Sequence, residues 1–584
     1  MSDALEQASL IMVPSGYENG TLGSLKPLDG SGDFTFSRGS DISATRVNED
    51  GLIEKGYENL LLQSNQFDTN WVSIFTTETG GQTGYDGSSD AWLLTKTDAN
   101  GRIYQSISSS GVQSISIYAK AGTLDWVRLQ VIDAINNPSV FFDLQNGVIG
   151  VNAGANYVDS SIESIGTDGW YRLRITFDKA ITLFNIYPAE GDNDTSGTSG
   201  SIYIQDAMLN QGLVAYPYVE TTTAPVAGGI LEDMPRLDYT DSSCPALLLE
   251  PQRTNLVPYS EYFSNPSNGS FELSDVISPE GLKNTTEFIS ENGNVECYEQ
   301  YSFSATSGLY YTISCFVKKN DFDFFQLRFT GAGGVFVGSG AWFNISTGDK
   351  ATIDSGITAD IKDAGNGWYR IYATRQATSS GGGGIRVQLA SGDGVNNTNG
   401  DGIKSTYIYG AQLEDATYPT SYIPTYGTSQ TRLQDSPTAS NVASLIGQTE
   451  GTLFMDCDNL NFNSDVMSFF PQSGSVYGSG ILIFLTSNDL RFFLFANSTN
   501  SIFTTSFVNG GRNKIAMTYT STAINAYVNG VKVGTGTSAA FPQPLNQIRL
   551  GSAQALNPNK NVNQALYFPT ALSDDECIAL TTIS

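Results

Sequence analysis

Aromatic and basic residues that face outward from predicted strands are the side chains best suited to bind a ligand. Segments 115–120, 126–131 and 170–175 alternate apolar and polar residues, and alternate side chains of a strand share one face. Burial of the apolar set leaves the other set outward: Tyr118, Lys120, Trp126, Arg128, Gln130, Trp170, Arg172 and Arg174. If these strands are neighbours, one face carries rings that stack on sugars and donors that bind hydroxyls. The pattern predicts glycan binding.

A later part of the chain offers a corresponding set of outward residues: Phe316, Lys318, Phe324, Gln326, Arg328, Trp368 and Arg370. The alternative for both sets is that they pack under loops or against a neighbouring subunit. For Trp170 and Trp368, which recur in both copies, we favour the packing role.

The loop from Glu190 to Gly200 begins like a calcium loop, with Asp192-x-Asp194-x-Ser196-Gly197. The twelfth position is Tyr203, where a bidentate glutamate is needed, so the full motif fails. A polar turn-rich loop stays open as the alternative. No cofactor is required by any motif, and calcium on oxygen ligands is the metal we expect if one is bound.

Catalytic patterns are missing from the sequence. It contains no histidine, which excludes Ser-His-Asp and Cys-His nucleophiles and histidine-based metal sites. A glycosidase needs two carboxylates about 5–9.5 Å apart, and no pair stands out among 59 acidic residues. The chain also lacks a Walker loop and a nucleophile elbow. We predict that it is not an enzyme.

Composition indicates an all-β protein of several domains. The chain has 584 residues, which is too long for one core, with 60 glycines, 11% aromatic residues and only 15% charged residues. The net charge of −29 and the absence of a basic stripe argue against nucleic-acid binding. No apolar run approaches the ~20 residues of a membrane span, so we expect no membrane insertion.

The cysteines and the N-terminus indicate folding in a reducing cytoplasm. The chain has no basic-then-apolar leader pattern. Its cysteines are odd in number and widely spaced, which predicts buried free thiols. They are Cys244, Cys297, Cys315, Cys457 and Cys577.

A colinear repeat indicates a duplicated domain. Gly169-Trp170-Tyr171-Arg172 recurs as Gly367-Trp368-Tyr369-Arg370, and Asn59-Leu60 is echoed by Asn255-Leu256. Alternating strands at short spacing predict that each copy is a jelly-roll β-sandwich. With GWYR as the strongest local match, the copies resemble carbohydrate-binding modules. By that resemblance Asp206 matches the calcium aspartate of such jelly rolls, although the second copy has Gly410 there.

The last part of the chain predicts a third sandwich. Asn529-Gly530 between two apolar runs predicts a tight hairpin, as does Asp50-Gly51 near the N-terminus. Ser573-Asp574-Asp575-Glu576 is a capping box before a short helix. YVNGVKVG, QIRLGS and ALSDDE together resemble a laminin-G or concanavalin-type domain.

The central stretch MPRLDYTDSSCPALLLEPQRTNLVPYSEYF, from Met234 to Phe263, carries a second resemblance. Short apolar runs between Pro, Asp and Ser clusters predict strands in it. The stretch resembles one found in tailed-phage virion proteins, namely head fibres, tail fibres and spikes. That resemblance implies a virion-surface protein made in the host cytoplasm.

These observations predict five parts: an N-terminal virion-proximal segment 1–55, a first jelly roll 56–226, a connecting segment 227–252, a second jelly roll 253–434 and a laminin-G-like sandwich 435–584. We expect a phage virion structural or adhesive protein that attaches to host-surface glycans. A capsid decoration protein without glycan binding and a tailspike depolymerase are the alternatives.

The expected partners are other virion proteins, which the N-terminal segment would contact. That segment has too few apolar residues to fold alone, so sister chains or a capsid protein should complete its core. The resemblance to phage fibres implies a homotrimer, and linked copies would strengthen weak glycan contacts.

Overall fold

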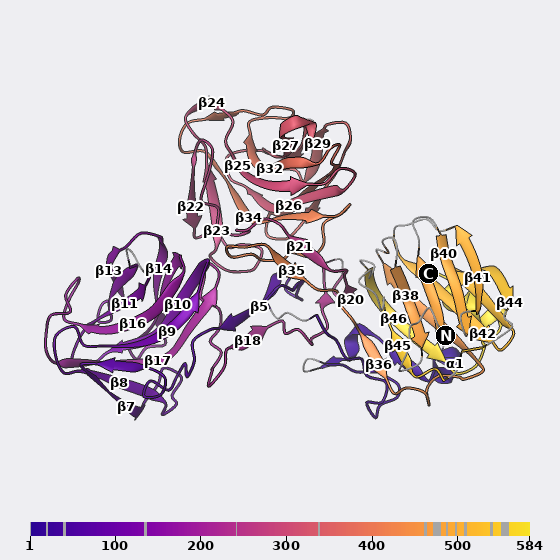
Figure 1. Ribbon diagram of the computed structural model, residues 1–584, viewed down its shortest axis with the longest axis horizontal. Helices are drawn as coiled ribbons and strands as arrows, with labels where there is room; N and C mark the ends of the chain where they lie inside the picture. Colours follow the sequence, from indigo (N-terminus) through magenta and orange to yellow (C-terminus); the bar gives the residue numbers. More distant parts are fainter. Residues whose placement is uncertain are drawn as a thin grey trace.

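The computed structural model describes residues 2–18, 21–38, 42–133, 137–240, 242–336, 339–458, 460, 464–470, 480–485, 489–496, 499–506, 511–537, 541–542, 544–550 and 560–583. The fold is all-β, as predicted, and consists of β-sandwiches (Figure 1). Three sandwiches surround a junction that contains β5 (Ile53–Asn59) and β18 (Val226–Gly229), and both chain ends lie in the sandwich drawn at the right.

The first sandwich packs two antiparallel sheets around a core that contains Ile117, Leu129 and Ile175. One sheet, in order, is β14 (Tyr157–Ile165), β15 (Trp170–Asp178), β10 (Val112–Ala121), β17 (Gly200–Gln211), β8 (Ala91–Lys96) and β7 (Thr76–Gln82). The other is β13 (Val148–Ala153), β12 (Ser139–Asp143), β11 (Trp126–Ile132), β16 (Ile181–Ala189), β9 (Arg102–Ser109) and β6 (Val72–Ile74).

The second sandwich repeats this topology. One sheet, in order, is β30 (Ile357–Asp363), β31 (Trp368–Gln376), β26 (Tyr310–Lys319), β34 (Ser405–Asp415), β23 (Thr285–Ile289) and β22 (Ser270–Ser274). The other is β29 (Asp349–Ile353), β28 (Ser339–Asn344), β27 (Phe324–Gly331), β32 (Gly381–Ala390) and β25 (Tyr298–Ala305). Trp170 and Trp368 begin equivalent strands, β15 and β31, so the predicted duplication is confirmed.

Two details are reproduced in both copies. The last long strand bulges against its neighbour, and the residue at the bulge has a positive φ: 53° at Asp206 and 62° at Gly410. Asn59 and Asn255 each donate to two backbone carbonyls, at 2.8 Å to Val219 and Ile423 respectively. These shared contacts explain why the sequence echoes itself at the two asparagines.

The C-terminal sandwich includes residues from both ends of the chain. One sheet, in order, is β19 (Leu237–Asp238), β20 (Ala246–Leu249), β46 (Lys560–Phe568), β37 (Glu450–Asp458), β42 (Asn513–Thr520), β43 (Ala523–Val528) and β44 (Val531–Thr537), with β1 (Leu10–Met12) also paired to β46. The other is β36 (Thr438–Ser440), β45 (Gln547–Arg549), β38 (Ser464–Phe470), β39 (Gly480–Leu485), β40 (Asp489–Ala496) and β41 (Thr499–Ser506).

This arrangement corrects the expectation for the N-terminal segment. Leu10, Met12, Leu22 and Phe34 are buried in the core of the C-terminal sandwich. The segment therefore completes its core within its own chain and does not need sister chains or a capsid protein to do so. The helix α1 (Ser2–Gln7), the 3₁₀ turn η1 (Pro14–Gly16) and the pair β2 (Tyr17–Glu18) and β3 (Thr21–Leu22) belong to the same segment.

The predicted turns are confirmed. Asn529 and Gly530, with φ of 50° and 81°, connect β43 to β44. The hairpin at Gly51 connects β4 (Thr45–Val47) to β5 (Ile53–Asn59). Helix α2 (Asp574–Thr581) begins after Ser573 with both hydrogen bonds of the capping box. The cysteine prediction needs one correction, because Cys244 is exposed while the other four are buried.

Short strands complete the junction and the rims of the second sandwich. They are β18 (Val226–Gly229), β21 (Arg253–Asn255), β24 (Gly293–Val295), β33 (Thr398–Gly400), β35 (Gln430–Arg432) and the 3₁₀ turn η2 (Ala332–Gly334). The prediction of strands in the central stretch is confirmed by β19 and β20, while Asp241 of its predicted turn lies outside the described residues.

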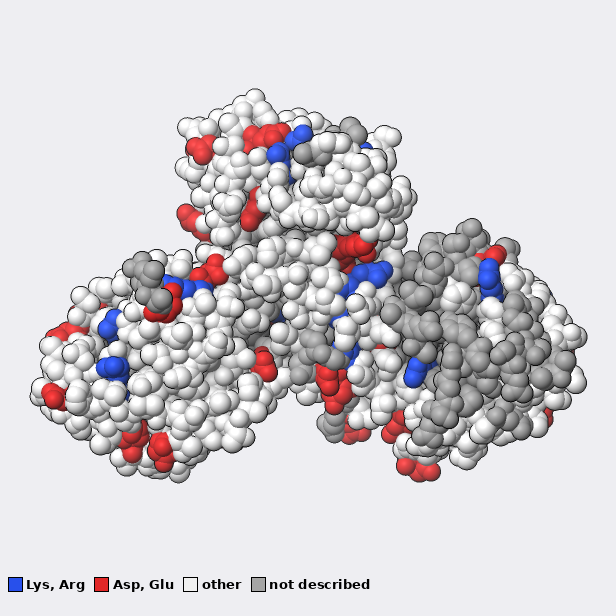
Figure 2. Space-filling model, in the orientation of Figure 1, with Lys and Arg blue, Asp and Glu red and all other residues white. Residues whose placement is uncertain are grey.

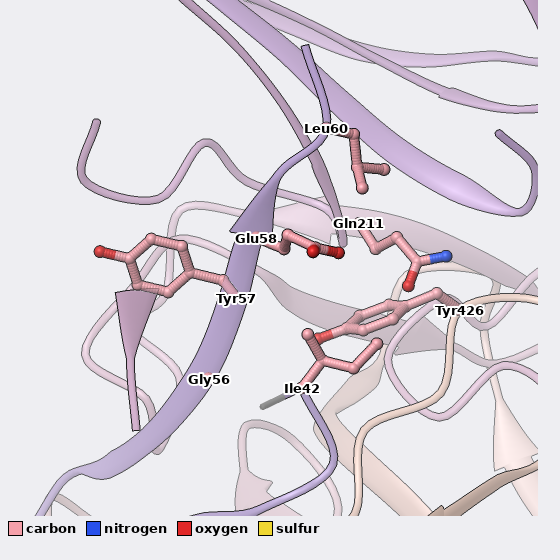
Figure 3. A pocket seen from close by; sticks show the side chains of 7 residues that line it. All are labelled: Ile42, Gly56, Tyr57, Glu58, Leu60, Gln211 and Tyr426. Carbon is pink, nitrogen blue, oxygen red and sulfur yellow. The ribbon is translucent and has the colours of Figure 1, made fainter. Parts of the chain in front are cut away.

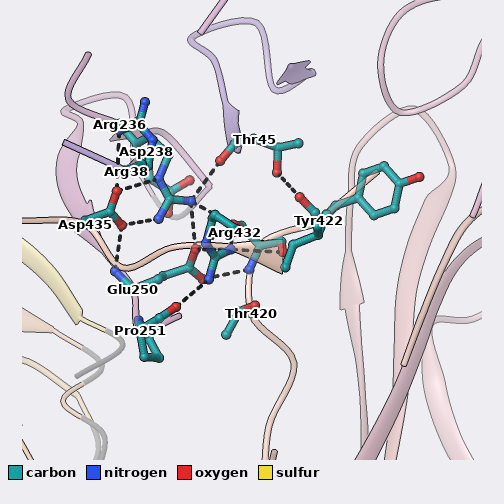
Figure 4. A network of polar contacts seen from close by, with 12 residues as sticks. Arg38, Thr45, Arg236, Asp238, Glu250, Pro251, Thr420, Tyr422, Arg432 and Asp435 are labelled. Atoms are coloured by element: carbon teal, nitrogen blue, oxygen red, sulfur yellow. Dashed lines mark hydrogen bonds and ion pairs between the residues drawn. The ribbon is translucent and has the colours of Figure 1, made fainter. Parts of the chain in front are cut away.

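A buried ion network fixes the central stretch at the junction (Figure 4). Arg236 Nη1 lies 2.7 Å from Glu250 Oε2, and Arg236 Nη2 pairs with Asp435. Glu250 also pairs with Arg432 at 2.9 Å, and Arg38 lies 3.5 Å from Asp435. These side chains come from four separated segments and are almost fully buried. The network therefore joins the N-terminal segment, the central stretch and the start of the third sandwich.

Candidate glycan-binding face

The structure divides the predicted glycan residues between two sheets, so they do not form one face. Tyr118, Lys120, Trp170 and Arg172 lie on β10 and β15, which are neighbours. Trp126, Arg128 and Gln130 lie on β11, in the opposite sheet. The predicted outward orientation is confirmed for both groups, because the residues that alternate with them along each strand lie in the core of the sandwich. The assumption that all three strands are adjacent is wrong.

The group on β10 and β15 is covered by the chain itself. Tyr85 stacks on Tyr118 with 3.8 Å between ring centroids and an interplanar angle of 8°. Trp170 is 2% exposed, and Arg172 donates to the Tyr216 carbonyl. Tyr118 and Trp170 therefore pack beneath the chain's own loops and are not available to stack on a sugar.

The equivalent group in the second sandwich is buried in the same way. Trp368 is fully buried and its indole N–H donates to the Ile277 carbonyl at 2.9 Å. Arg370 Nη2 donates to the Thr420 carbonyl at 2.7 Å, beside a buried Phe316. Lys318 donates to the Asn366 carbonyl. Trp170 and Trp368 therefore have the packing role that we favoured for them from the sequence.

The outer face of the β11 sheet remains the candidate surface of the first sandwich. Trp126 and Arg128 are half-buried there. The guanidinium carbon of Arg128 lies 5.4 Å from the Phe141 ring centroid and 5.3 Å from that of Tyr187. Tyr187 donates to Gln130 Oε1 at 3.1 Å. Burial lowers the pKa of Arg128, with a smaller opposing effect of Tyr187. We call this surface the Arg128 face.

Three further residues of the Arg128 face were missed from the sequence. Arg102 on β9 lies with its guanidinium carbon 5.6 Å from the Tyr187 ring centroid. Asn185, on β16, is 1% exposed, and neither atom of its amide has a hydrogen-bond partner. Apolar and polar residues alternate in the sequences of β9 and β16, which indicates the faces of these strands but not their neighbours. Only the pairing of β16 with β11 and β9 places Arg102, Asn185 and Tyr187 beside Arg128.

In the second sandwich a loop lies over the matching face. Phe324, Gln326 and Arg328 occupy the positions of Trp126, Arg128 and Gln130. Gln326 Nε2 donates to Asn396 Oδ1 at 3.1 Å, and the Trp342 indole donates to the Val395 carbonyl at 2.9 Å. These bonds hold the loop across β27 and β28.

The matching loop of the first sandwich is anchored elsewhere. Asp192 accepts from the Val151 amide at 2.7 Å, on the edge strand β13. The Thr195 carbonyl accepts from Lys96 Nζ at 2.9 Å, on the opposite sheet. Thr195 also accepts from the Asn100 amide at 2.9 Å and donates to Asn100 Oδ1 at 2.8 Å, in the turn before β9. The loop is therefore bonded to the edge strand, to the opposite sheet and to this turn, and not to β11 as its counterpart is bonded to β27.

The predicted calcium aspartates lie in three different settings. Asp192 accepts a hydrogen bond from the Val151 amide, and Asp194 accepts from the backbone amide and the hydroxyl of Ser196. Asp206 accepts from Tyr85 Oη at 2.9 Å, and burial raises its pKa to about 7. Across the described ranges, no group of three or more carboxylate or thiolate residues is placed to hold a metal.

Two cavities lie at the junction, away from the Arg128 face. One of about 20 Å³ lies where the Tyr426 ring meets Gln211 and Ile42, with room for about one water molecule (Figure 3). A cleft of about 480 Å³ opens beside Glu250, Ser421 and Tyr422. The carboxylate of Glu250 and the hydroxyl of Ser421 already belong to the ion network.

The surface carries few charged groups on the face drawn in Figure 2, and lysines and arginines are scattered there without a basic band. Within the described residues, no helix is both long and apolar enough to cross a bilayer.

No protein-family model and no curated protein matches this chain. Among solved structures, it is similar to the CBM40 of the Ruminococcus gnavus IT-sialidase bound to alpha2,3 sialyllactose, at 16% identity over 24% of this chain and 86% of that chain, with a TM-score of 0.22. It is similar to the binding domain of botulinum neurotoxin DC in complex with rat synaptotagmin II, at 13% identity over 25% and 39%, with a TM-score of 0.22. It is also similar to a leech intramolecular trans-sialidase, at 16% identity over 24% of each chain, with a TM-score of 0.22. This chain thus spans less than two thirds of the last two, and none of these similarities bears on individual side chains.

Proposed function

We propose that this chain is a structural and adhesive protein of a tailed-phage virion, which displays β-sandwich modules that attach to host-surface glycans. The phage part of the proposal rests on the resemblance of the stretch from Met234 to Phe263. The adhesive part rests on one observation: the Arg128 face presents half-buried Trp126 and Arg128 on the same strand as Gln130, and Asn185, opposite Gln130, has amide atoms without a protein partner.

The chemistry of that face suits a saccharide. A half-exposed indole offers an apolar plane for a sugar ring, and guanidinium and amide groups offer donors for hydroxyls. Buried polar atoms without partners carry a free-energy cost that a bound hydroxyl or carbonyl would relieve. The buried Trp170 and Trp368 are excluded from this role, and Trp126, Arg128 and Gln130 carry it.

A glycan array probed with the full chain tests the adhesive function. We expect binding to a restricted set of glycans, and weaker binding by a Trp126→Ala variant that thermal unfolding shows to be folded. Parallel arrays with calcium and with a chelator test the calcium proposal for Asp192, Asp194 and Asp206. Failure to bind any glycan would favour a decoration protein, and release of reducing ends from host polysaccharide would reveal a depolymerase.

The assembly we propose is a homotrimer on the virion surface. Single glycan contacts are weak, and several linked copies bind at high effective concentration. Cyclic symmetry presents the same face of each copy toward one side. Sedimentation of the full chain tests the trimer, and a monomer would contradict it.

A further inference from the structure

We infer that the Arg128 face binds a saccharide that carries a carboxylate, and that the first sandwich, not its second copy, holds this site. The inference rests on the proposed glycan-binding function and names its ligand class. It follows from the charges on the face and from a comparison between the two copies of the sandwich.

Two guanidinium groups on the Arg128 face lack a carboxylate partner. Arg102 and Arg128 both lie against the Tyr187 ring. Arg102 Nη1 donates to the Asn100 carbonyl at 3.4 Å, and Arg128 Nη2 donates to the Ser139 hydroxyl at 3.3 Å. Neither forms an ion pair within the part of the chain that the structure describes. The Nε atom of each is buried without a hydrogen-bond partner. The face therefore holds two uncompensated positive charges around one aromatic ring.

The carboxylates that border this face are already occupied. Asp143, beside Trp126, accepts from the amides of Gln145 and Asn146 at 2.9 and 3.0 Å. Asp192 accepts from the Val151 amide. Both lie toward the Trp126 end, so positive charge concentrates at the Arg102 end and a negatively charged group is expected there.

The second sandwich supplies a natural contrast. Its outer face also carries two arginines, Arg328 and Arg386, but both pair with Glu296, at 2.8 and 2.9 Å. The guanidinium carbon of Arg386 also lies 3.6 Å from the Tyr298 ring centroid. Each of these guanidinium groups therefore has a carboxylate partner within the chain, and Glu296 balances one of the two positive charges. Together with the loop over Gln326, this pairing closes the second copy to an anionic ligand.

A carboxylate on a sugar ring fits the first copy best. Guanidinium groups bind carboxylates with short, charge-assisted hydrogen bonds, and partial burial strengthens such pairs. The amide of Asn185, whose nitrogen and oxygen both lack a hydrogen-bond partner at 1% exposure, adds recognition of a hydroxyl. A neutral saccharide would leave both guanidinium charges uncompensated.

The test uses the full chain and oligosaccharides of matched length in neutral, carboxylate-bearing, carboxyl-reduced and sulfated forms, such as oligogalacturonides and their reduced counterparts. The variant is Arg128→Gln, because glutamine occupies the equivalent position in the second sandwich at Gln326. The control is Arg328→Gln, which removes an arginine that is already paired with Glu296. Thermal unfolding of all three proteins confirms that each is folded.

We expect binding to concentrate on carboxylate-bearing glycans, to weaken roughly tenfold to a hundredfold in Arg128→Gln, and to persist in Arg328→Gln. Binding to neutral or carboxyl-reduced glycans that Arg128→Gln leaves intact would overturn the inference while the adhesive function stands. Equal binding of sulfated glycans would overturn the choice of carboxylate. Absence of binding to every glycan would reject both the inference and the adhesive function.

Discussion

Asp206 and Gly410 occupy the same bulge in the two sandwiches, with φ of 53° and 62°, and only the first carries a carboxyl group. The pKa of Asp206 is raised to about 7, chiefly by burial, with the hydrogen bond from Tyr85 opposing this effect and the charges of Asp90 and Asp86 adding to it. What the two copies share is the backbone conformation. The carboxyl at this position adds a dependence on pH to the first sandwich only.

We predict that stability of the first sandwich falls between pH 3.8 and about 7 through Asp206. The folded-state pKa of about 7 exceeds the ordinary value of 3.8, so the folded state binds the proton more tightly. The resulting stability is fully present below pH 3.8 and is lost as pH rises through 7. Asp206→Asn stays neutral and tolerates a positive φ. It should stabilise the protein by on the order of 2 to 4 kcal/mol at pH 8 and by little at pH 4, measured by thermal unfolding. An equal gain at both pH values would contradict the assignment.

We predict that the ion network around Arg236 is essential for stability at the junction. Arg236→Met leaves Glu250 and Asp435 buried with less compensation, and loss of one partner of a buried pair costs about 3–5 kcal/mol. The surface arginine Arg46, which pairs with Glu54 at 2.7 Å while more exposed, is the matched control. Arg46→Met should cost at most about 1 kcal/mol in denaturant unfolding. Similar losses in the two variants would refute a special role for the network.

The network also predicts loss of stability in acid. Burial alone would raise the pKa of Glu250, but the guanidinium groups of Arg432 and Arg236 outweigh it and lower the pKa to about 2. A lowered folded-state pKa means stability that is present above pH 4.5 and is lost as pH falls toward 2. Glu250→Gln should flatten this acid limb and lower stability at pH 7. An unchanged acid limb would contradict the role of Glu250.

We predict that the N-terminal segment is part of the C-terminal sandwich. Leu10 is fully buried in that core, and its truncation in Leu10→Ala should cost about 2–5 kcal/mol. Leu28 in the same segment is 89% exposed, so Leu28→Ala should leave stability within about 0.5 kcal/mol. Denaturant unfolding measures both. An N-terminal segment that acts only as an attachment arm would make Leu10→Ala as neutral as Leu28→Ala.

The sequence was sufficient for those parts of the fold that local patterns determine. Alternation predicted which side of β10, β11 and β15 faces the core, and Asn529-Gly530 and the capping box at Ser573 predicted their turn and helix. The colinear repeat predicted two sandwiches of one topology. Each of these signals lies within a few residues or compares the chain with itself.

Contacts between distant segments could not be predicted in this way. β11 follows β10 in the sequence but lies in the opposite sheet, which separates Trp126 from Tyr118. Leu10 pairs with Tyr567 across nearly the whole chain, and alternation does not indicate that partner. The Arg128 face depends on such pairings, so Asn185 and Arg102 became candidates only once β16 and β9 were placed.

We predict that substitutions of Trp126 and Trp368 have different effects, because Trp126 binds glycan and Trp368 packs in the interior. Trp126 is half-buried on the outer face of β11, between Asp143 and Ala189 of the neighbouring strands, so Trp126→Ala should weaken glycan binding and cost about 1 kcal/mol or less in stability. Trp368 is fully buried and bonded to the Ile277 carbonyl, so Trp368→Ala should cost about 3–5 kcal/mol through the cavity it leaves. Trp368→Phe fills most of that space and should restore part of the loss, and the glycan profile of the folded Phe variant should match the wild type. Loss of glycan binding in a folded Trp368→Phe protein would place the site on the second sandwich instead, because its buried ring could affect a ligand only through that module.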